Sequence, residues 1–172
     1  MADGKTEQIS RIKVGDRVES ADPTTGKPVG ARTVQATLVH LDSNLVSVGV
    51  RDGRGRTSTL DTTTEHLFWD ATSRDWVPAD QLQPGHALRT LDGTRAVVAD
   101  VQRGHGSAYR YNLTVDQLHT YYVLAGSTPV LVHNCQLALG WRTKGTAEWA
   151  GENGFNHMIA NPTTAGRNRR NA

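Results

Sequence analysis

Apolar and polar residues alternate along most of this chain, and this alternation restricts its fold more than any other feature. The run Leu45–Arg51 is typical, with a valine at every second position. A period of two places successive side chains on opposite faces of a β-strand. Turn signals such as Asp52-Gly53 and Asp92-Gly93 separate the segments. Because no stretch before Cys135 has the pattern of a long amphipathic helix, the sequence predicts an all-β fold. The candidate strands are Arg17–Ser20, Thr33–His40, Leu45–Arg51, Ser58–Thr62, Leu67–Asp70, Ala87–Leu91, Ala96–Val101, Arg110–Val115, Tyr121–Leu124 and Val130–Val132.

A weak internal repeat runs through the β part. The segment Ile12–Val18 resembles Leu82–Leu88, and the two lie 70 residues apart. The same offset joins Asp22 to Asp92, each at a turn between candidate strands. Chance recurrence of common turn residues is one explanation, but a duplicated, two-fold β architecture explains the order better. The matching strands further along are Leu45–Val50 and Arg110–Val115.

The pattern changes at Asn134/Cys135. Residues 144–154 have a composition compatible with a helix, which Thr146 would cap. We therefore predict a β domain over residues 1–134 and a short, partly helical tail over residues 135–172. The tail is below the size at which a chain usually folds unaided.

Charge and hydropathy narrow the possible partners. The formal net charge of +2 is too small to indicate nucleic-acid binding by the β domain. Three arginines crowd the last residues, where a solvated end is a simpler explanation than a nucleic-acid contact. No apolar run reaches membrane-spanning length and no signal peptide opens the chain, so we expect no membrane association.

The only cysteine of the chain, Cys135, directly follows His133 and Asn134. A turn with a solvated histidine is the ordinary explanation. The chemical explanation is that an asparagine side-chain amide can attack its own main-chain carbonyl, forming a succinimide and expelling the next residue. That reaction needs the amide held in attack geometry, a proton donor for the leaving nitrogen, and stabilisation of the tetrahedral carbon.

Two further histidines lie in suggestive contexts. His66 closes Thr63-Thr64-Glu65-His66 before an apolar strand, and His119 lies between two candidate strands. Taken singly, each is typical of a packed or surface histidine. A zinc site of His66, His119, His133 and Cys135 is an alternative, but their spacing matches no standard zinc motif. We therefore predict no metal and no cofactor.

Taken in order, these motifs resemble those of a Hint domain, the fold shared by inteins and hedgehog autoprocessing domains, in the version found in bacterial polymorphic toxins (the pretoxin Hint type). The resemblance rests on the start of the chain through Val18, on Thr63-x-x-His66, on Asn112-Leu-Thr-Val through His119-Thr, and on Val130-Leu-Val-His133-Asn134-Cys135. It implies a horseshoe of two duplicated β subunits related by a pseudo-two-fold axis.

The resemblance also implies roles for residues. Asn134 would be the nucleophile of a single-turnover self-cleavage at Asn134–Cys135, and Cys135 would become the first residue of the released piece. His119 would act as base or orienting partner, and His133 as donor to the leaving amine. Thr63 and His66 match the block that activates the scissile bond upstream of the domain.

The sequence departs from the family pattern in two places. The family begins with a Cys or Ser nucleophile, whereas this chain starts at Met1, so we expect an N-terminally truncated domain that cannot splice. The family also has an acidic residue where this chain has Asn112, which leaves a proton-transfer role there open.

The tail resembles the opening of the toxin segments that follow such domains. The implied substrate is the chain itself, and an immunity protein is an implied partner of the full-length toxin. Full-length relatives are secreted or cell-surface bacterial toxins, whereas the location of this chain is left undetermined. His157 lies in the tail and has no predicted catalytic role in so short a segment. The alternatives are an inactive Hint-fold remnant with a structural or binding role, and a nuclease activity in the tail.

Overall fold

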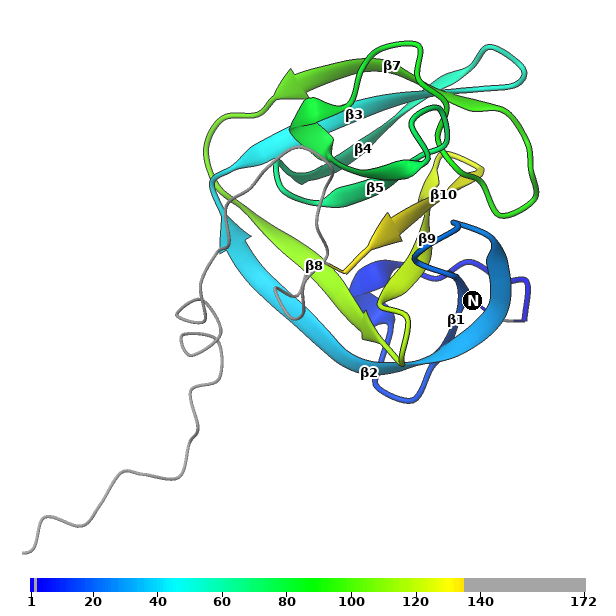
Figure 1. Ribbon diagram of the computed structural model, residues 1–172. Coiled ribbons are helices and arrows are strands. Elements are labelled where there is room, and N and C mark those ends of the chain that lie inside the picture. The colour runs from blue at the N-terminus through cyan, green and yellow to red at the C-terminus, as the bar shows by residue number, and fades with distance from the viewer. Residues whose placement is uncertain (2, 135–172) are drawn as a thin grey trace, which may run out of the picture. The chain divides into compact units, whose positions relative to one another are not determined.

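The computed structural model describes residues 1 and 3–134, and this part of the chain is built from strands (Figure 1). No helix in the described part is long and apolar enough to cross a membrane. The predicted helix within residues 144–154 lies outside the described residues. The elements in chain order are η1 (Ile9–Arg11), β1 (Arg17–Ala21), β2 (Pro28–Asp42), β3 (Leu45–Asp52), β4 (Thr57–Thr63), β5 (Leu67–Asp70), β6 (Asp75–Pro78), η2 (Ala79–Gln81), β7 (Ala96–Arg103), β8 (Ala108–Val115), β9 (Thr120–Ala125) and β10 (Thr128–His133), where η marks a short 3-10 helix.

The strands form three sheets whose neighbours pair antiparallel. Their strand orders are β1-β2-β8, β4-β3-β7 and β6-β5-β10-β9. Figure 1 shows β2 and β8 running together as a long ribbon, with the end of β10 approaching β8. The last described strand, β10, therefore lies inside a sheet, between β5 and β9.

Most of the predicted strands are confirmed, with differences at two places. The prediction of a strand over Ala87–Leu91 is wrong, because this segment makes only isolated bridges, to Asp70, Val97 and Val130 in turn. A segment that passes between different sheets cannot build a continuous ladder with any one of them. The short strand β6 was not predicted, since four residues give too little alternation to detect.

The 70-residue repeat is a real duplication of structure. Each 3-10 helix is followed by a glycine with positive φ, at +94° for Gly15 and +90° for Gly85. The N–H of Gly15 donates to the carbonyl of Val34 at 2.9 Å, and that of Gly85 donates to Val98 at 2.8 Å. Equivalent residues thus make equivalent bonds in the two halves.

The two turns that follow repeat the same geometry. A carboxylate oxygen of Asp22 accepts a hydrogen bond from the N–H of Thr24 at 2.8 Å and a second, short one from the Thr24 hydroxyl. Asp92 accepts the same pair from Thr94, at 3.1 and 2.8 Å. These bonds lower the pKa of both carboxylates. Aspartate favours such turns because its side chain bonds main-chain N–H groups two residues on.

The two halves also exchange strands. The register pairs Val34 of β2 with Val115 of β8, and Val98 of β7 with Val50 of β3. In both pairs, a strand of the first half (β2 or β3) is bonded to a strand of the second half (β8 or β7). All four valines are buried, at 0–2% exposure, in one apolar cluster. Burying a valine side chain contributes roughly 1.5–3 kcal/mol, so this shared core joins the halves.

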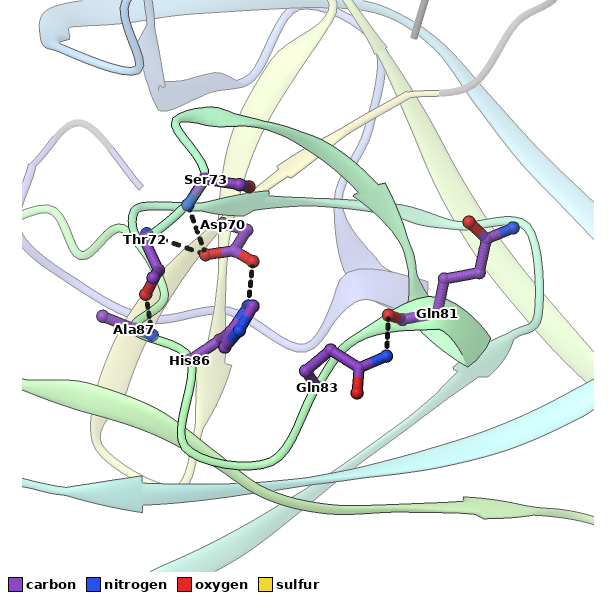
Figure 2. Close-up of polar contacts among 7 residues, drawn as sticks. All are labelled: Asp70, Thr72, Ser73, Gln81, Gln83, His86 and Ala87. Carbon is purple, nitrogen blue, oxygen red and sulfur yellow. Dashed lines mark hydrogen bonds and ion pairs between the residues drawn. The ribbon is translucent and has the colours of Figure 1, made fainter. Parts of the chain in front are cut away.

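Asp70, the last residue of β5, anchors the β5–β6 hairpin (Figure 2). One of its oxygens accepts the N–H groups of Thr72 and Ser73, and the other lies 2.6 Å from Nδ1 of His86. The Thr72 hydroxyl in turn accepts the N–H of Ala87 at 2.8 Å. Burial raises the pKa of Asp70, but the bonds from His86 and the main chain outweigh it and leave the pKa below its usual value. The buried carboxylate therefore fixes β5, which flanks β10.

A glycine substitution tests the packing beneath this hairpin. At Gly26, φ is +64° and an added Cβ would lie 2.5 Å from the indole of Trp69. At Gly93, φ is similar, +74°, but the space around it is open. Both Gly→Ala variants bear the left-handed backbone cost of roughly 1–2 kcal/mol, and Gly26→Ala adds an overpacking cost of roughly 1–3 kcal/mol. Urea unfolding should show a larger loss in the free energy of unfolding for Gly26→Ala than for Gly93→Ala. Equal losses for the two variants would contradict the close contact.

Candidate functional site

The register of β10 places Asn134 between two histidine-bearing turns. His133 is the Cα partner of Leu67 on one side and of Thr120 on the other. Asn134 therefore follows β10 at the sheet end where His66 precedes β5 and His119 precedes β9. The N–H of Asn134 donates to the carbonyl of His119 at 2.7 Å, extending the β9–β10 ladder by one bond.

The Asn134 side chain is buried and held at both ends of its amide. The residue is 1% exposed. Its Nδ2 donates to the hydroxyl of Thr114 at 3.1 Å, and its Oδ1 accepts from Nδ2 of Asn112 at 3.2 Å. Both partners are on β8, so a strand from a different sheet fixes this side chain (Figure 1). A buried amide without partners would cost free energy, and here each end has one.

Asn112 is itself fixed by two donors. Its Oδ1 accepts the N–H of Leu113 and the hydroxyl of Tyr121, both at 2.9 Å. Burial raises the pKa of Tyr121 far above its usual value, so the phenol keeps its proton and donates at neutral pH. Asn112 stands where the family pattern has an acid, and in this chain it is a hydrogen-bonding neighbour of Asn134.

His133 lies on the opposite face of β10 from Asn134, against an aromatic pair. Its ring packs edge-on against Trp76, with ring centroids 5.0 Å apart, and Trp76 packs in the same manner on Trp69 at 5.1 Å. Burial lowers the pKa of His133 to about 4, a hydrogen bond with the Asn134 main chain opposes this shift, and the charge of His119 adds to it. The imidazole is therefore neutral at pH 7 and lies beside the main chain of Asn134.

His119 has an unusual backbone, with φ at +55° in the turn between β8 and β9. Its ring centroid lies 6.3 Å from that of His133. Within the described part of the chain, Nδ1 of His119 and Nδ1 of His133 are both buried without a hydrogen-bond partner. Such orphaned imidazole nitrogens are uncommon in a protein interior.

Thr63 and His66 belong to the turn between β4 and β5. Thr63 ends β4, and its carbonyl accepts the N–H of His66 at 3.1 Å. The half-buried His66 packs edge-on against Phe68, with ring centroids 5.8 Å apart. Burial, and then the charge of His133, lower the pKa of His66 to about 4. The backbone register thus brings His66, His119, His133 and Asn134 to one end of the sheet, and Thr63 lies three residues from His66.

Several residues of this site were not predicted from the sequence. Thr114, Tyr121 and Trp76 had no predicted role, and Asn112 stood out only as a departure from the family pattern. One signal was present, since Asn112 and Thr114 alternate with the buried Leu113 along β8 and so share the other strand face. That face would ordinarily be solvated, and nothing local indicates that it meets the end of β10.

Cys135, the predicted first residue of the released segment, lies outside the described residues. Within residues 1 and 3–134, no group of three or more His, Cys, Asp or Glu side chains is arranged to hold a metal ion. The prediction that the site works without a metal stays a prediction.

Comparisons with known proteins identify the family and the fold of this chain. The family model of the pretoxin Hint domain matches residues 1–135. This chain belongs to the pretoxin Hint domain family. The fold is also that of a bacterial intein-like domain from Clostridium thermocellum, with 32% sequence identity, a TM-score of 0.62, and 73% of this chain and 86% of that chain covered. A DnaB intein from Synechocystis matches with 18% identity and a TM-score of 0.56, covering 76% of this chain and 88% of that chain. A comparison with curated proteins gave no match.

The family assignment gives the Hint domain an autoprocessing fold with intein-like architecture. The predicted all-β fold with duplicated subunits is confirmed. The four sequence motifs named above and the buried Asn134 side chain lie within the matched residues.

The lowered histidine pKa values predict a pH-dependent stability. In the folded Hint domain the pKa values of His66 and His133 are about 4, whereas an unfolded histidine titrates near 6.5. Between these values the unfolded chain binds protons that the folded chain does not, so the free energy of unfolding falls as pH drops from 6.5 towards 4. At pH 5 each histidine should lower the free energy of unfolding by roughly 2 kcal/mol, and above pH 7 neither histidine should change it.

Urea unfolding at pH 7.5 and at pH 5 measures this effect. His66→Phe and His133→Phe should each flatten the pH dependence, because the buried titrating ring is removed. His105 is exposed, and His105→Gln is the matched control that should leave the dependence unchanged. A dependence that persists in both Phe variants would contradict the assignment to these two rings.

Proposed function

We propose that this Hint domain cleaves its own chain at the Asn134–Cys135 peptide bond by cyclisation of Asn134, and so releases residues 135–172. The observation that carries the proposal is the buried amide of Asn134, held by Thr114 and Asn112 directly before the bond to be broken. His119 and His133, whose Nδ1 atoms have no hydrogen-bond partner among the described residues, lie at the same end of the sheet as Asn134.

The reaction balances without water or a cofactor. Nδ2 of Asn134 forms a bond to its own main-chain carbonyl carbon and closes a succinimide ring. The bond from that carbon to the nitrogen of Cys135 breaks. The amide nitrogen loses one proton and the departing amine gains one, so the acid and base only have to move a proton between them. This is a single-turnover reaction, with the Hint domain as both enzyme and substrate.

Positioning supplies much of the expected acceleration. The main chain of Asn134 is fixed by its N–H bond to His119, and the side chain by its bonds to β8. A free asparagine samples many rotamers, and few of them place Nδ2 near its own carbonyl. Fixing both reacting groups removes that entropy cost before the reaction begins, and intramolecular reactions gain several kcal/mol in this way.

We assign the proton transfers to His119 and His133. His133 interacts with the main chain of Asn134, which supports a role as donor at the scissile peptide. His119 has an unpaired Nδ1 and its ring lies 6.3 Å from that of His133, which supports a role as base or orienting partner. The His133 ring is buried, in surroundings of low polarity, where a positioned charge has a stronger effect than in water.

Thr63 and His66 keep the role that the family motif implies, activation of a bond upstream of the domain. The turn that carries His66 lies at the same end of the sheet as His133, which supports a common location for the two processing steps. Cys135 becomes the N-terminal residue of the released segment. We further propose that this segment is part of a toxin and that an immunity protein is its partner.

Variants of Asn134 and of the two histidines test the proposed function. Incubation of the purified chain should yield a body ending in succinimide or Asn134 and a 38-residue tail, 172 minus 134 residues, beginning at Cys135. Asn134→Ala should abolish cleavage because alanine has no attacking amide. His119→Ala and His133→Ala should each slow it by about 10²–10⁴-fold, the usual effect of a positioned acid or base. Intact-mass spectrometry over time measures all three.

The exposed His105→Ala is the control, and it should cleave at the unmodified rate. Equal cleavage in the unmodified chain and in Asn134→Ala would identify a contaminating protease and refute the mechanism. An unmodified chain that stays intact under all conditions would support the inactive-remnant alternative.

A further inference from the structure

We infer that Asn112 decides which end of the Asn134 amide faces which neighbour, and that Thr114 is therefore the group in contact with the nucleophilic nitrogen. The inference rests on the proposed cyclisation and adds two residues to it. Asn112 would be a positioning residue and Thr114 a catalytic residue, because of these two residues it is Thr114 whose hydroxyl contacts the reacting nitrogen.

The argument begins at a main-chain donor. An amide side chain looks almost the same after a half-turn that exchanges its oxygen and nitrogen, so its orientation must follow from its partners. The N–H of Leu113 can only donate, and it lies 2.9 Å from one end of the Asn112 amide. That end is therefore the oxygen. The hydroxyl of Tyr121, protonated at neutral pH, donates to the same oxygen at 2.9 Å.

The orientation of Asn112 then determines that of Asn134. With its oxygen occupied by Leu113 and Tyr121, Asn112 presents Nδ2 to Asn134. Nδ2 is a donor only, so the facing atom of Asn134 must be its oxygen, at 3.2 Å. The remaining end of the Asn134 amide is the nitrogen, and it lies 3.1 Å from the hydroxyl oxygen of Thr114.

The reverse orientation is expensive at this site. It would place two amide nitrogens face to face and remove the acceptor that Asn112 needs. Asn134 is 1% exposed, so no bulk water replaces the lost bonds. Leaving buried donors unpaired is strongly unfavourable, so the amide spends nearly all of its time with nitrogen towards Thr114.

Orientation matters because only the nitrogen forms a succinimide. A half-turn of the amide would place the oxygen where the attacking nitrogen lies. The Thr114 hydroxyl also accepts the hydrogen bond from Nδ2, which draws the proton away from the nitrogen and increases its electron density towards the carbonyl carbon. The proton that leaves Nδ2 ends on the amine of Cys135, as in the proposed reaction.

NMR of the uncleaved chain tests the orientation independently of cleavage. The Nδ2 protons of Asn134 should give a stronger nuclear Overhauser effect to the methyl of Thr114 than to the β-methylene protons of residue 112. The His133→Ala chain serves if cleavage is too fast to record the unmodified one. A reversed ratio would overturn the inference.

Asn112→Asp provides the decisive comparison. An ionised carboxylate keeps the bonds from Leu113 and Tyr121 with one oxygen, but its other oxygen accepts where Nδ2 donated. The Asn134 amide should then rotate by a half-turn, which exchanges its oxygen and nitrogen, and the ratio of the two Overhauser effects should reverse. A purely structural role for Asn112 would lower stability without reversing that ratio. An unchanged ratio would refute the role of Asn112.

Cleavage rates test Thr114. Thr114→Val has nearly the same shape but no hydroxyl, and it should slow cleavage by about 10–100-fold, at or just below the usual range for a positioned proton-transfer group. Thr114→Ser keeps the hydroxyl and should restore most of the rate. Urea unfolding of both variants separates this effect from loss of fold. Equal rates for the Val variant and the unmodified chain would refute the role of Thr114.

The two proposals fail in different ways. An unmodified chain that never cleaves, with the expected Overhauser effects, would refute the proposed function and leave the orientation of Asn134 established. Cleavage that depends on Asn134 but not on Thr114 would refute only the further inference.

Discussion

The whole site depends on the pairing of β10 between β5 and β9. The last bond of this ladder, from the N–H of Asn134 to the carbonyl of His119, measures 2.7 Å and is made by the residue before the proposed scissile bond. A register slip of one residue would turn Asn134 to the opposite face of the sheet, away from Asn112 and Thr114. The strand pairing therefore determines which side chain can act as nucleophile.

The duplication explains why this site needs both halves of the domain. Because the halves exchange strands, β8 of the second half pairs with β2 of the first. The second half supplies Asn112 and Thr114 on β8 and Asn134 after β10, and the turn before β5 in the first half brings His66 to the same end of the sheet. The shared core of buried valines holds the two halves together.

The same burial that stabilises the site also controls its ionisation. The aromatic packing of Trp76 on His133 removes water from the imidazole and lowers its pKa to about 4. The free energy of unfolding of the domain therefore falls below pH 6.5, because the unfolded chain gains protons there that the folded chain does not. A site that is more exposed would avoid that cost, but water would compete for the hydrogen bonds that orient Asn134.

The sequence by itself determined the strands, the duplication and the order of the motifs, because period-two alternation, turn residues and short motifs are local properties. It also singled out Asn134 and the histidines as candidates, since an asparagine before a lone cysteine has recognisable chemistry. It failed at Ala87–Leu91, where three different partners replace one ladder. Only the tertiary structure decided that Asn112 and Thr114 meet Asn134, which lies 22 and 20 residues further along the chain. Hydrogen bonds between two sheets depend on how those sheets pack against each other, and no local pattern records that packing.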